Sequence, residues 1–203
     1  MINTGVDDVT RRWTLRLVAG LAAGAVLLSG CSGQQEANDT LPGADATPSA
    51  SEGELPPLGP EEFPVPAAAR EKTPEGALAF AKYYMSLGTK IGEGTISANA
   101  LLDLSDGCEL CQQVASSYEA DQAAGYTYRN SSHTFDEYAL PALSGDTAEL
   151  GFVYSQSAYI VVDEAGNEID ERSGDATGDL QSGMLLRWQD AVKAWTVTSL
   201  TVG

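Results

Sequence analysis

Two cysteines, Cys108 and Cys111, lie three positions apart and form the clearest pair of reactive side chains in the chain. They fall at the start of an expected helix, where amide dipoles lower a thiol pKa, so a redox-active pair is chemically allowed. No strand leads into the pair as in a thioredoxin motif, and a zinc site would need further ligands in a chain with one His. The pattern favours a structural disulfide, which in so short a loop stabilises the fold by roughly 2 kcal/mol.

The third cysteine, Cys31, ends the sequence Leu-Ser-Gly-Cys at residues 28–31. A cationic segment (11–16) and an apolar segment (17–28) precede it, which is the order of a secretory signal. The motif matches a lipobox, so we expect cleavage before Cys31 and a diacylglycerol thioether on its thiol. The apolar segment is shorter than the roughly 20 residues that a membrane-spanning helix needs. An ordinary signal peptide that ends near a cysteine is the alternative.

These features predict a signal peptide (1–30) and a protein held by acyl chains on the extracytoplasmic face of the cell membrane. Upstream, residues 10–16 (Thr-Arg-Arg-Trp-Thr-Leu-Arg) are similar to a twin-arginine export motif. Thr14 occupies the position where Phe is usual, so an ordinary arginine-rich leader is an equal alternative. The two export routes differ in whether the domain folds before or after export.

The chain of 203 residues is strongly acidic, with 29 Asp and Glu against 11 Lys and Arg and a formal charge of -18. This charge argues against nucleic acid as a partner, because binding needs cationic side chains to replace phosphate counterions. The acidity is typical of a soluble, self-repelling surface; a docking surface for a cationic partner or metal ions is the alternative. Acidic residues gather over 163–179, but Ala165 breaks the EF-hand spacing, so we expect a solvated, mobile loop without metal.

Residues 31–66 are rich in Pro, Ser, Gly and acidic residues and poor in large apolar side chains. Such a segment cannot bury enough surface to offset the entropy lost on ordering. We therefore expect a disordered tether from the lipidated Cys31 to residue 66, semi-extended from about residue 56 where Pro is dense. Residues 67–203 have the length of one globular domain.

Three helices are expected at the start of this domain. The Thr-Pro pair at 73–74 supplies an N-cap and a first helical residue, and Gly88 is expected to end or weaken this helix. A short helix over 95–104 and a third over 105–124 follow, and Gly125 closes the third at its C-cap. The apolar face of the first helix comprises Phe80, Tyr84, Leu87 and Ile91.

After Gly125 the apolar residues recur with a period of two, which predicts strands. The expected strands cover 126–138, 147–162, 183–189 and 195–202, and a hairpin loop separates the last two. Helices followed by strands predict an α+β fold. Its three N-terminal helices would pack on one face of a mainly antiparallel sheet of about four strands.

Two stretches are similar to a lipoprotein family of high-GC Gram-positive bacteria that carries no established activity. They are Lys-Thr-Pro-Glu-Gly-Ala (72–77) with Tyr83 and Tyr84, and Leu-Ser-Asp-Gly-Cys-Glu-Leu-Cys (104–111). The likeness covers about residues 60–203. The order of elements, ending in a Trp-Thr-Val-Thr strand, resembles the nuclear transport factor 2-like superfamily, which has a cystatin-like cone fold. That resemblance implies a curved sheet that encloses an apolar pocket together with the first helices. Some superfamily members are isomerases or dehydratases that use Asp, His or Tyr inside the cone, and many others are binding or dimerisation modules.

Large aromatic side chains are the candidates for lining such a pocket, although residues at these spacings are also typical of a core. The candidates are Tyr84, Tyr118, Phe152, Tyr154, Trp188 and Trp195. The one histidine, His133, lies in a polar strand, and no sequence spacing places a nucleophile and an orienting acid beside it. We therefore expect His133 to be exposed.

These observations favour a non-catalytic module of the cell envelope that binds a small apolar ligand or an envelope protein. The alternative is a small enzyme of the isomerase or dehydratase type, which would need a buried Asp or Glu with a raised pKa in the cone pocket. No motif assigns a catalytic role to any residue, and we expect no cofactor.

Overall fold

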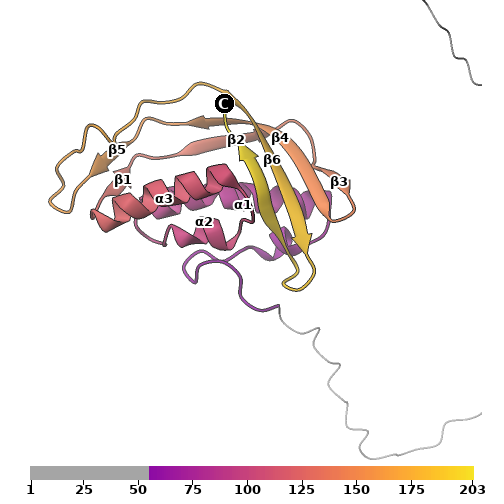
Figure 1. Cartoon of the computed structure of the whole chain (residues 1–203). Helices are drawn as coiled ribbons and strands as arrows, with labels where there is room; N and C mark the ends of the chain where they lie inside the picture. The colour runs from indigo at the N-terminus through magenta and orange to yellow at the C-terminus, as the bar shows by residue number, and fades with distance from the viewer. Residues whose placement is uncertain (1–54) are drawn as a thin grey trace, which may run out of the picture. The chain divides into compact units, whose positions relative to one another are not determined.

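A computed structural model describes residues 55–203 (Figure 1). The expected signal peptide (1–30), Cys31 and the tether up to residue 54 lie outside the described residues. The elements in chain order are the 3-10 helix η1 (Ala67–Arg70), α1 (Pro74–Gly92), α2 (Asn99–Asp103), α3 (Glu109–Ala123), β1 (Thr127–Arg129), β2 (His133–Glu137), β3 (Ala142–Ser144), β4 (Thr147–Gln156), β5 (Ile160–Val162), β6 (Leu180–Gln189) and β7 (Ala194–Thr201).

Helix α1 begins where the sequence predicts but extends further. The Thr73 hydroxyl accepts a hydrogen bond from the Gly76 amide at 3.0 Å, and Pro74 occupies the first helical position. The helix does not end at Gly88, because its buried face continues on both sides of that glycine as far as Gly92. The buried face includes Phe80, Tyr84, Leu87 and Ile91, as the sequence predicts.

Helices α2 and α3 are both shorter than expected. Leu102 of α2 is 39% exposed. Helix α3 starts only after Cys108, because the Cys108 sulfur accepts a hydrogen bond from the Cys111 amide at 3.2 Å and so caps the first turn. Gly125 lies just beyond the C-terminal end of α3 with a φ of 72°, a left-handed conformation that suits glycine.

The strands expected over 126–138 and 147–162 pair with each other, but each is interrupted once. Strands β2 and β4 pair antiparallel, and β1 and β5 continue the same register beyond the interruption. There Asn130 adopts a φ of 61°, and Ser132 is bonded to Ser157 through its amide (2.9 Å to Oγ) and its carbonyl (2.9 Å from the Ser157 amide). The alternating pattern did not signal this turn of the backbone.

The main sheet has the order β2–β4–β6–β7, with β3 paired to the start of β4, and these neighbours are antiparallel. Figure 1 shows α1, α2 and α3 gathered on one face of this curved sheet. A register shift between Leu185 and Leu186 marks a bulge, which bends the strand and increases its twist. The expected α+β fold is therefore confirmed, with seven strands in residues 55–203 instead of about four.

The core lies between the helices and the inner face of the sheet. On β4 the side chains of Ala148, Leu150 and Phe152 are buried, whereas those of Thr147 and Glu149 are exposed. The same alternation runs along β6. Because one face of the sheet meets the helices and the other meets solvent, the period of two in the sequence is explained.

The packed structure extends further toward the N-terminus than the boundary expected at residue 67. The Val65 amide donates to the Leu58 carbonyl at 2.8 Å, and the Phe63 ring stacks on Tyr83 with centroids 5.0 Å apart. The Tyr83 hydroxyl donates to the Phe63 carbonyl at 2.7 Å. Residues 55–66 therefore belong to the domain and not to a disordered tether, because a few apolar side chains anchor a Pro-rich segment.

The acidic segment 163–179 is folded against the domain and is not the mobile loop that we expected. Arg172 donates to the buried carboxylate of Asp121 on α3 at 2.5 Å. An isolated antiparallel bridge joins Tyr159 to Gly174, where an added Cβ would lie 2.7 Å from the Tyr159 ring. Most carboxylates of residues 163–179 are exposed, as the acidic composition predicted, but the composition did not indicate these anchoring contacts.

Candidate functional site

A cavity of about 270 Å³ lies between the helices and the inner face of the sheet. Several of its lining residues are only half-buried, so the cavity is open to solvent. Its walls come from α1, α2, α3, the end of β4 and the end of β7. The lining residues are Tyr84, Met85, Gly88, Leu101, Leu110, Cys111, Val114, Tyr118, Tyr154, Gln156, Leu200 and Val202.

Three of the six aromatic residues proposed for a pocket, Tyr84, Tyr118 and Tyr154, line this cavity. The other three do not. Phe152 is fully buried and stacks on Phe135 with centroids 4.1 Å apart.

Trp188 and Trp195 lie beside the β6–β7 turn and meet edge to face at 5.2 Å. The Trp195 indole N–H donates to the Glu71 carbonyl at 2.9 Å, which fixes this ring in the core. All six aromatic candidates are core-facing in the sequence pattern. The three aromatic residues that line the cavity differ from the other three in their position relative to the helices, and the sequence pattern does not indicate that position.

The three lining tyrosines differ in how their hydroxyls are bonded. The Tyr84 hydroxyl donates to the Leu101 carbonyl at 3.0 Å, and the Tyr154 hydroxyl donates to the Gln156 side-chain oxygen at 3.1 Å. The Tyr118 hydroxyl makes no hydrogen bond to any other residue in 55–203. Burial raises the pKa of Tyr84 and of Tyr118 to about 12, so both phenols keep their protons at neutral pH.

Gly88 makes room for the Tyr118 hydroxyl at the wall of the cavity. A Cβ added at Gly88 would lie 3.3 Å from that oxygen, which is a tight contact. Glycine in the middle of a helix costs roughly 0.5–1 kcal/mol relative to alanine. The close approach of Tyr118 gives a physical reason for a glycine at this position.

We expected His133 to be exposed, but its side chain is half-buried because β2 turns it toward the helices. Its Nδ1 lies 3.2 Å from the Thr89 hydroxyl, and its ring stacks on Tyr154 with centroids 5.9 Å apart. The ring borders a small hollow of about 30 Å³ that shares Tyr118 and Gln156 with the main cavity. Burial lowers the pKa of His133 below its ordinary value, which favours the neutral imidazole.

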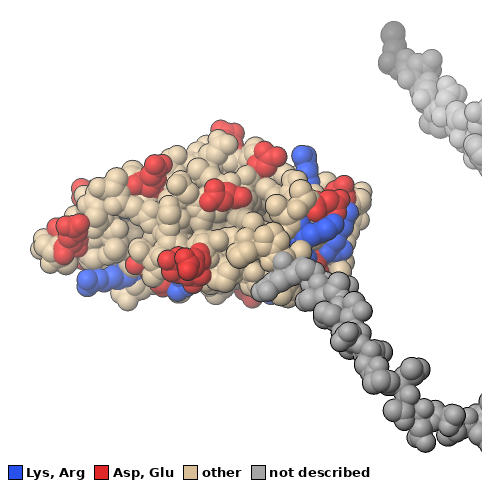
Figure 2. All heavy atoms as spheres, turned by 90° about the horizontal axis from the view of Figure 1, so that it is seen from below, with Lys and Arg blue, Asp and Glu red and all other residues tan. Residues whose placement is uncertain are grey.

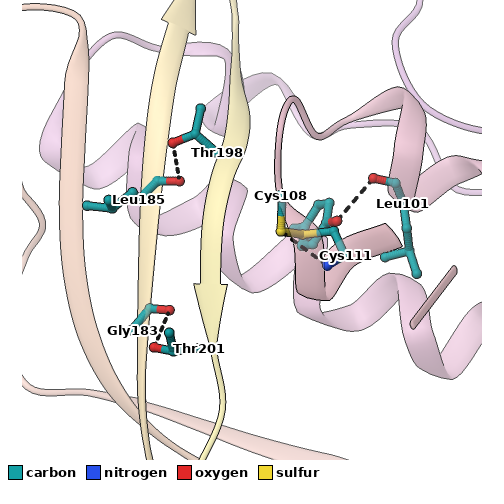
Figure 3. The surroundings of a disulfide bond; sticks show 8 residues. Leu101, Cys108, Cys111, Gly183, Leu185, Thr198 and Thr201 are labelled. Carbon is teal, nitrogen blue, oxygen red and sulfur yellow. Dashed lines mark hydrogen bonds between the residues drawn. A yellow bond between two sulfur atoms is a disulfide. The ribbon is translucent and has the colours of Figure 1, made fainter. Parts of the chain in front are cut away.

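Cys108 and Cys111 are joined by a disulfide at the start of α3, beside Leu101 of α2 (Figure 3). Each cysteine is 1% exposed. The bond lies behind the cavity wall, to which Cys111 contributes. This placement fits the structural role that the sequence favoured, because a redox partner would have to reach buried sulfur atoms.

The residues that line the main cavity include no Asp, Glu, Lys, Arg or His. Asp121 is the one buried carboxylate in residues 55–203, and it is bonded to Arg172 and to the Tyr128 hydroxyl, both at 2.5 Å. It does not line the cavity. In the described part of the chain, no group of three or more His, Cys, Asp or Glu is placed to hold a metal ion. The site therefore offers apolar contact and neutral hydrogen-bonding groups.

Acidic side chains on the face shown in Figure 2 are scattered and do not form one patch. Within residues 55–203, several acidic side chains are paired with cations, including Glu137 with Lys82 at 2.9 Å and Asp190 with Lys193 at 3.1 Å. This distribution is that of a solvated surface, and it gives no concentrated docking site for a cationic partner on this face.

Several lining residues gave no functional signal in the sequence. Met85, Leu110 and Leu200 occupy ordinary apolar positions, and Gln156 ends a strand. Gly88 interrupts the apolar helical pattern of α1, and a glycine inside a good helix can mark a close approach by another group. The sequence pattern alone predicted that Gly88 ends or weakens the helix, and the close approach of Tyr118 is the alternative that the structure shows.

Comparison with known proteins addresses the fold. No family model matches the chain, and no curated protein sequence matches it. Among solved structures, the intermembrane space region of the chloroplast protein ARC6 aligns over 65% of this chain and 97% of its own, with 12% identity and a TM-score of 0.50.

Two further structures align less well. An NTF2-like superfamily protein from Salmonella enterica serovar Typhimurium covers 63% of this chain and 92% of its own, with 11% identity and a TM-score of 0.37. The protein Aln2 from a Streptomyces species covers 64% and 90%, with 12% identity and a TM-score of 0.39. The ARC6 likeness concerns the fold alone, and it agrees with the three helices over a curved antiparallel sheet that the sequence predicted.

Proposed function

We propose that this protein is a lipid-anchored module of the cell envelope whose NTF2-like domain binds a small, mainly apolar ligand in the cavity. The observation that carries the proposal is a cavity of about 270 Å³ with aromatic and aliphatic walls and no charged lining residue. Ligand pockets in proteins are typically about 300–1,000 Å³ and mostly apolar with a few polar groups. The size of this cavity favours a ligand at the small end of that range.

The anchor in this proposal is Cys31, in the Leu-Ser-Gly-Cys motif after an apolar segment. Within residues 55–203, no helix has both the length and the apolar character needed to cross a membrane. Two or more acyl chains bury many CH₂ groups, at about 0.8 kcal/mol each, and so give stable attachment without a spanning helix. The domain would then meet its ligand at the extracytoplasmic surface.

The enzyme alternative receives no support from the lining residues. A proton-transferring isomerase or dehydratase of the expected type would need an acid inside the cone. None of the lining residues is acidic, and the buried Asp121 is held by Arg172 outside the cavity. Binding without chemistry is therefore the function that the cavity supports best.

Ligand binding can be tested with N-phenyl-1-naphthylamine, a neutral probe whose fluorescence rises in apolar surroundings. We expect saturable binding by the purified chain and at least tenfold weaker binding by L110E, because this change places a charge in the cavity wall. The matched control is L102E, since Leu102 is exposed outside the cavity. V114F fills the cavity without charge and serves if L110E does not fold. No saturable binding, or equal binding by all three variants, would overturn the proposal.

Lipidation can be tested separately in the full chain expressed in a bacterium that processes lipoproteins. We expect an alkyne-tagged fatty acid to label the wild-type chain and the protein to sediment with membranes. C31A should lose the label and leave the membrane fraction, whereas the double variant C108S/C111S should keep both. Labelling that persists in C31A, or a wild-type chain without label, would contradict the anchor.

A further inference from the structure

We propose that the cavity selects uncharged ligands that carry a hydrogen-bond acceptor, such as a ketone or amide carbonyl, next to an apolar ring, and that the Tyr118 hydroxyl donates to this acceptor. The inference deepens the proposed function and rests on the cavity being a ligand site.

The Tyr118 hydroxyl is the free donor among the lining phenols. The other two lining tyrosines donate to protein oxygens, Tyr84 to the Leu101 carbonyl and Tyr154 to the Gln156 side chain. Tyr118 has no such partner in residues 55–203, although its side chain is half-buried and its ring packs on the ring of Tyr128. Its oxygen is not among the buried polar atoms of residues 55–203 that lack a partner, so it can be reached from the cavity, where a ligand acceptor can take the place of water.

A second donor accompanies Tyr118. The Gln156 side-chain oxygen accepts from Tyr154, and the side-chain nitrogen Nε2 of Gln156 makes no hydrogen bond to a described residue. Gln156 and Tyr118 line both the main cavity and the small hollow beside His133. The two donors therefore lie where the two spaces meet, while the rest of the main cavity wall is mostly aliphatic and aromatic.

The same surroundings disfavour an anion. Burial raises the pKa of the Tyr118 phenol, with smaller contributions from Tyr154, Tyr159 and the Asp121 carboxylate. An anionic ligand at the Tyr118 hydroxyl would meet no cation among the lining residues. Bringing a carboxylate out of water without a partner is strongly unfavourable.

The aromatic walls favour a ring in the body of the ligand. Tyr84, Tyr118 and Tyr154 contribute from α1, α3 and β4. Aromatic pairs gain stability beyond the burial of their area when they stack or meet edge to face. A flat ring with an adjoining carbonyl therefore fits both the walls and the donors.

Three compounds of similar shape separate the contributions: benzophenone, diphenylmethane and diphenylacetate. Each is titrated against bound N-phenyl-1-naphthylamine in the wild-type chain and in Y118F. We expect Y118F to weaken benzophenone binding roughly three- to tenfold, within the range for one neutral hydrogen bond. The same variant should change diphenylmethane less than about twofold, because no acceptor is present. Diphenylacetate should bind the wild-type chain at least tenfold more weakly than benzophenone.

The control variant is Y84F, which removes a lining hydroxyl that is already bonded to Leu101. It should change benzophenone and diphenylmethane by the same factor. Equal losses for both compounds in Y118F, no loss for benzophenone, or tight binding of diphenylacetate would overturn this inference while leaving the cavity a ligand site. Failure of the fluorescent probe itself to bind would instead overturn the proposed function.

Discussion

A single glycine in the middle of α1 sets how closely Tyr118 approaches that helix. In G88A the added methyl group would meet the Tyr118 hydroxyl at 3.3 Å, so the ring must shift by a few tenths of an ångström or turn into the cavity. Alanine also favours the helix by about 0.5–1 kcal/mol. We therefore expect the free energy of unfolding to stay the same or rise, while the affinity for N-phenyl-1-naphthylamine falls about threefold or more.

Urea denaturation and probe titration measure the two effects of G88A separately. S86A, also on α1, is the control, because Ser86 bonds to the Lys82 carbonyl of its own helix and does not line the cavity. It should leave probe affinity unchanged. If G88A binds the probe as well as the wild type does, the close approach of Tyr118 has no role in shaping the cavity.

The burial of His133 leads to a pH prediction that one side chain can test. Its folded-state pKa is lowered by burial, and its hydrogen-bond partner Thr89 and stacking partner Tyr154 are uncharged at neutral pH. The unfolded chain therefore binds a proton more readily than the folded chain just below pH 6.5, the ordinary value for histidine. The stability contributed by neutral His133 is present above this pH and is lost as the pH falls through the lower folded-state pKa.

This chain has one histidine, so NMR titration follows a single imidazole. We expect a midpoint below 6.5, and a decline of stability between that midpoint and 6.5 that the variant H133Q lacks. A midpoint at or above the ordinary histidine value would show that the ring is solvated.

At the scale of elements, the sequence was informative wherever local chemistry fixes the outcome. The Thr73 cap and the apolar face of α1 follow from neighbouring residues, as does the glycine after α3. The break at Asn130 and the folding of 163–179 depend on partners far along the chain, such as Ser157 and Asp121. The cavity depends on such contacts too, because periodicity separates buried from exposed positions but cannot distinguish a lining tyrosine from a core phenylalanine.

The ion pair between Arg172 and Asp121 holds the acidic segment against α3. The Asp121 side chain is 5% exposed, so removing Arg172 would leave a buried charge with only the Tyr128 and solvent contacts to compensate. We expect R172Q to lower the free energy of unfolding by about 3 kcal/mol, the low end for breaking a buried pair. Urea denaturation measures the loss.

Two further variants give this prediction its controls. The double variant D121N/R172Q should recover part of the loss, because the unpaired charge is gone. K90Q removes an exposed pair with Glu93 and should change stability by less than about 1 kcal/mol. A loss in R172Q no larger than that in K90Q would mean that Asp121 is solvated after all.

At the scale of the whole molecule, the segment before α1 connects the domain to the remainder of the chain. Arg70 donates to the Pro56 carbonyl at 2.6 Å and to the Val192 carbonyl in the β6–β7 turn at 2.5 Å. This guanidinium thus fixes the entry of the chain beside the end of the sheet that holds the two tryptophans. Within residues 55–203, the cavity is lined by other segments than the one that Arg70 holds.

The boundary of the domain can therefore be measured as a difference in stability. A chain that begins at residue 55 should unfold with the same free energy as the full chain, whereas one that begins at 67 should lose about 3–5 kcal/mol. The estimate comes from losing the buried Val65 and the half-buried Leu58 and Phe63, because burying a large apolar side chain completely contributes about 1.5–3 kcal/mol. Urea denaturation compares the three chains. F63A in the full chain should reproduce part of the loss, because it uncovers the Tyr83 ring on which Phe63 stacks. Equal stability of the chains that begin at 55 and 67 would return residues 55–66 to the tether that their composition indicated.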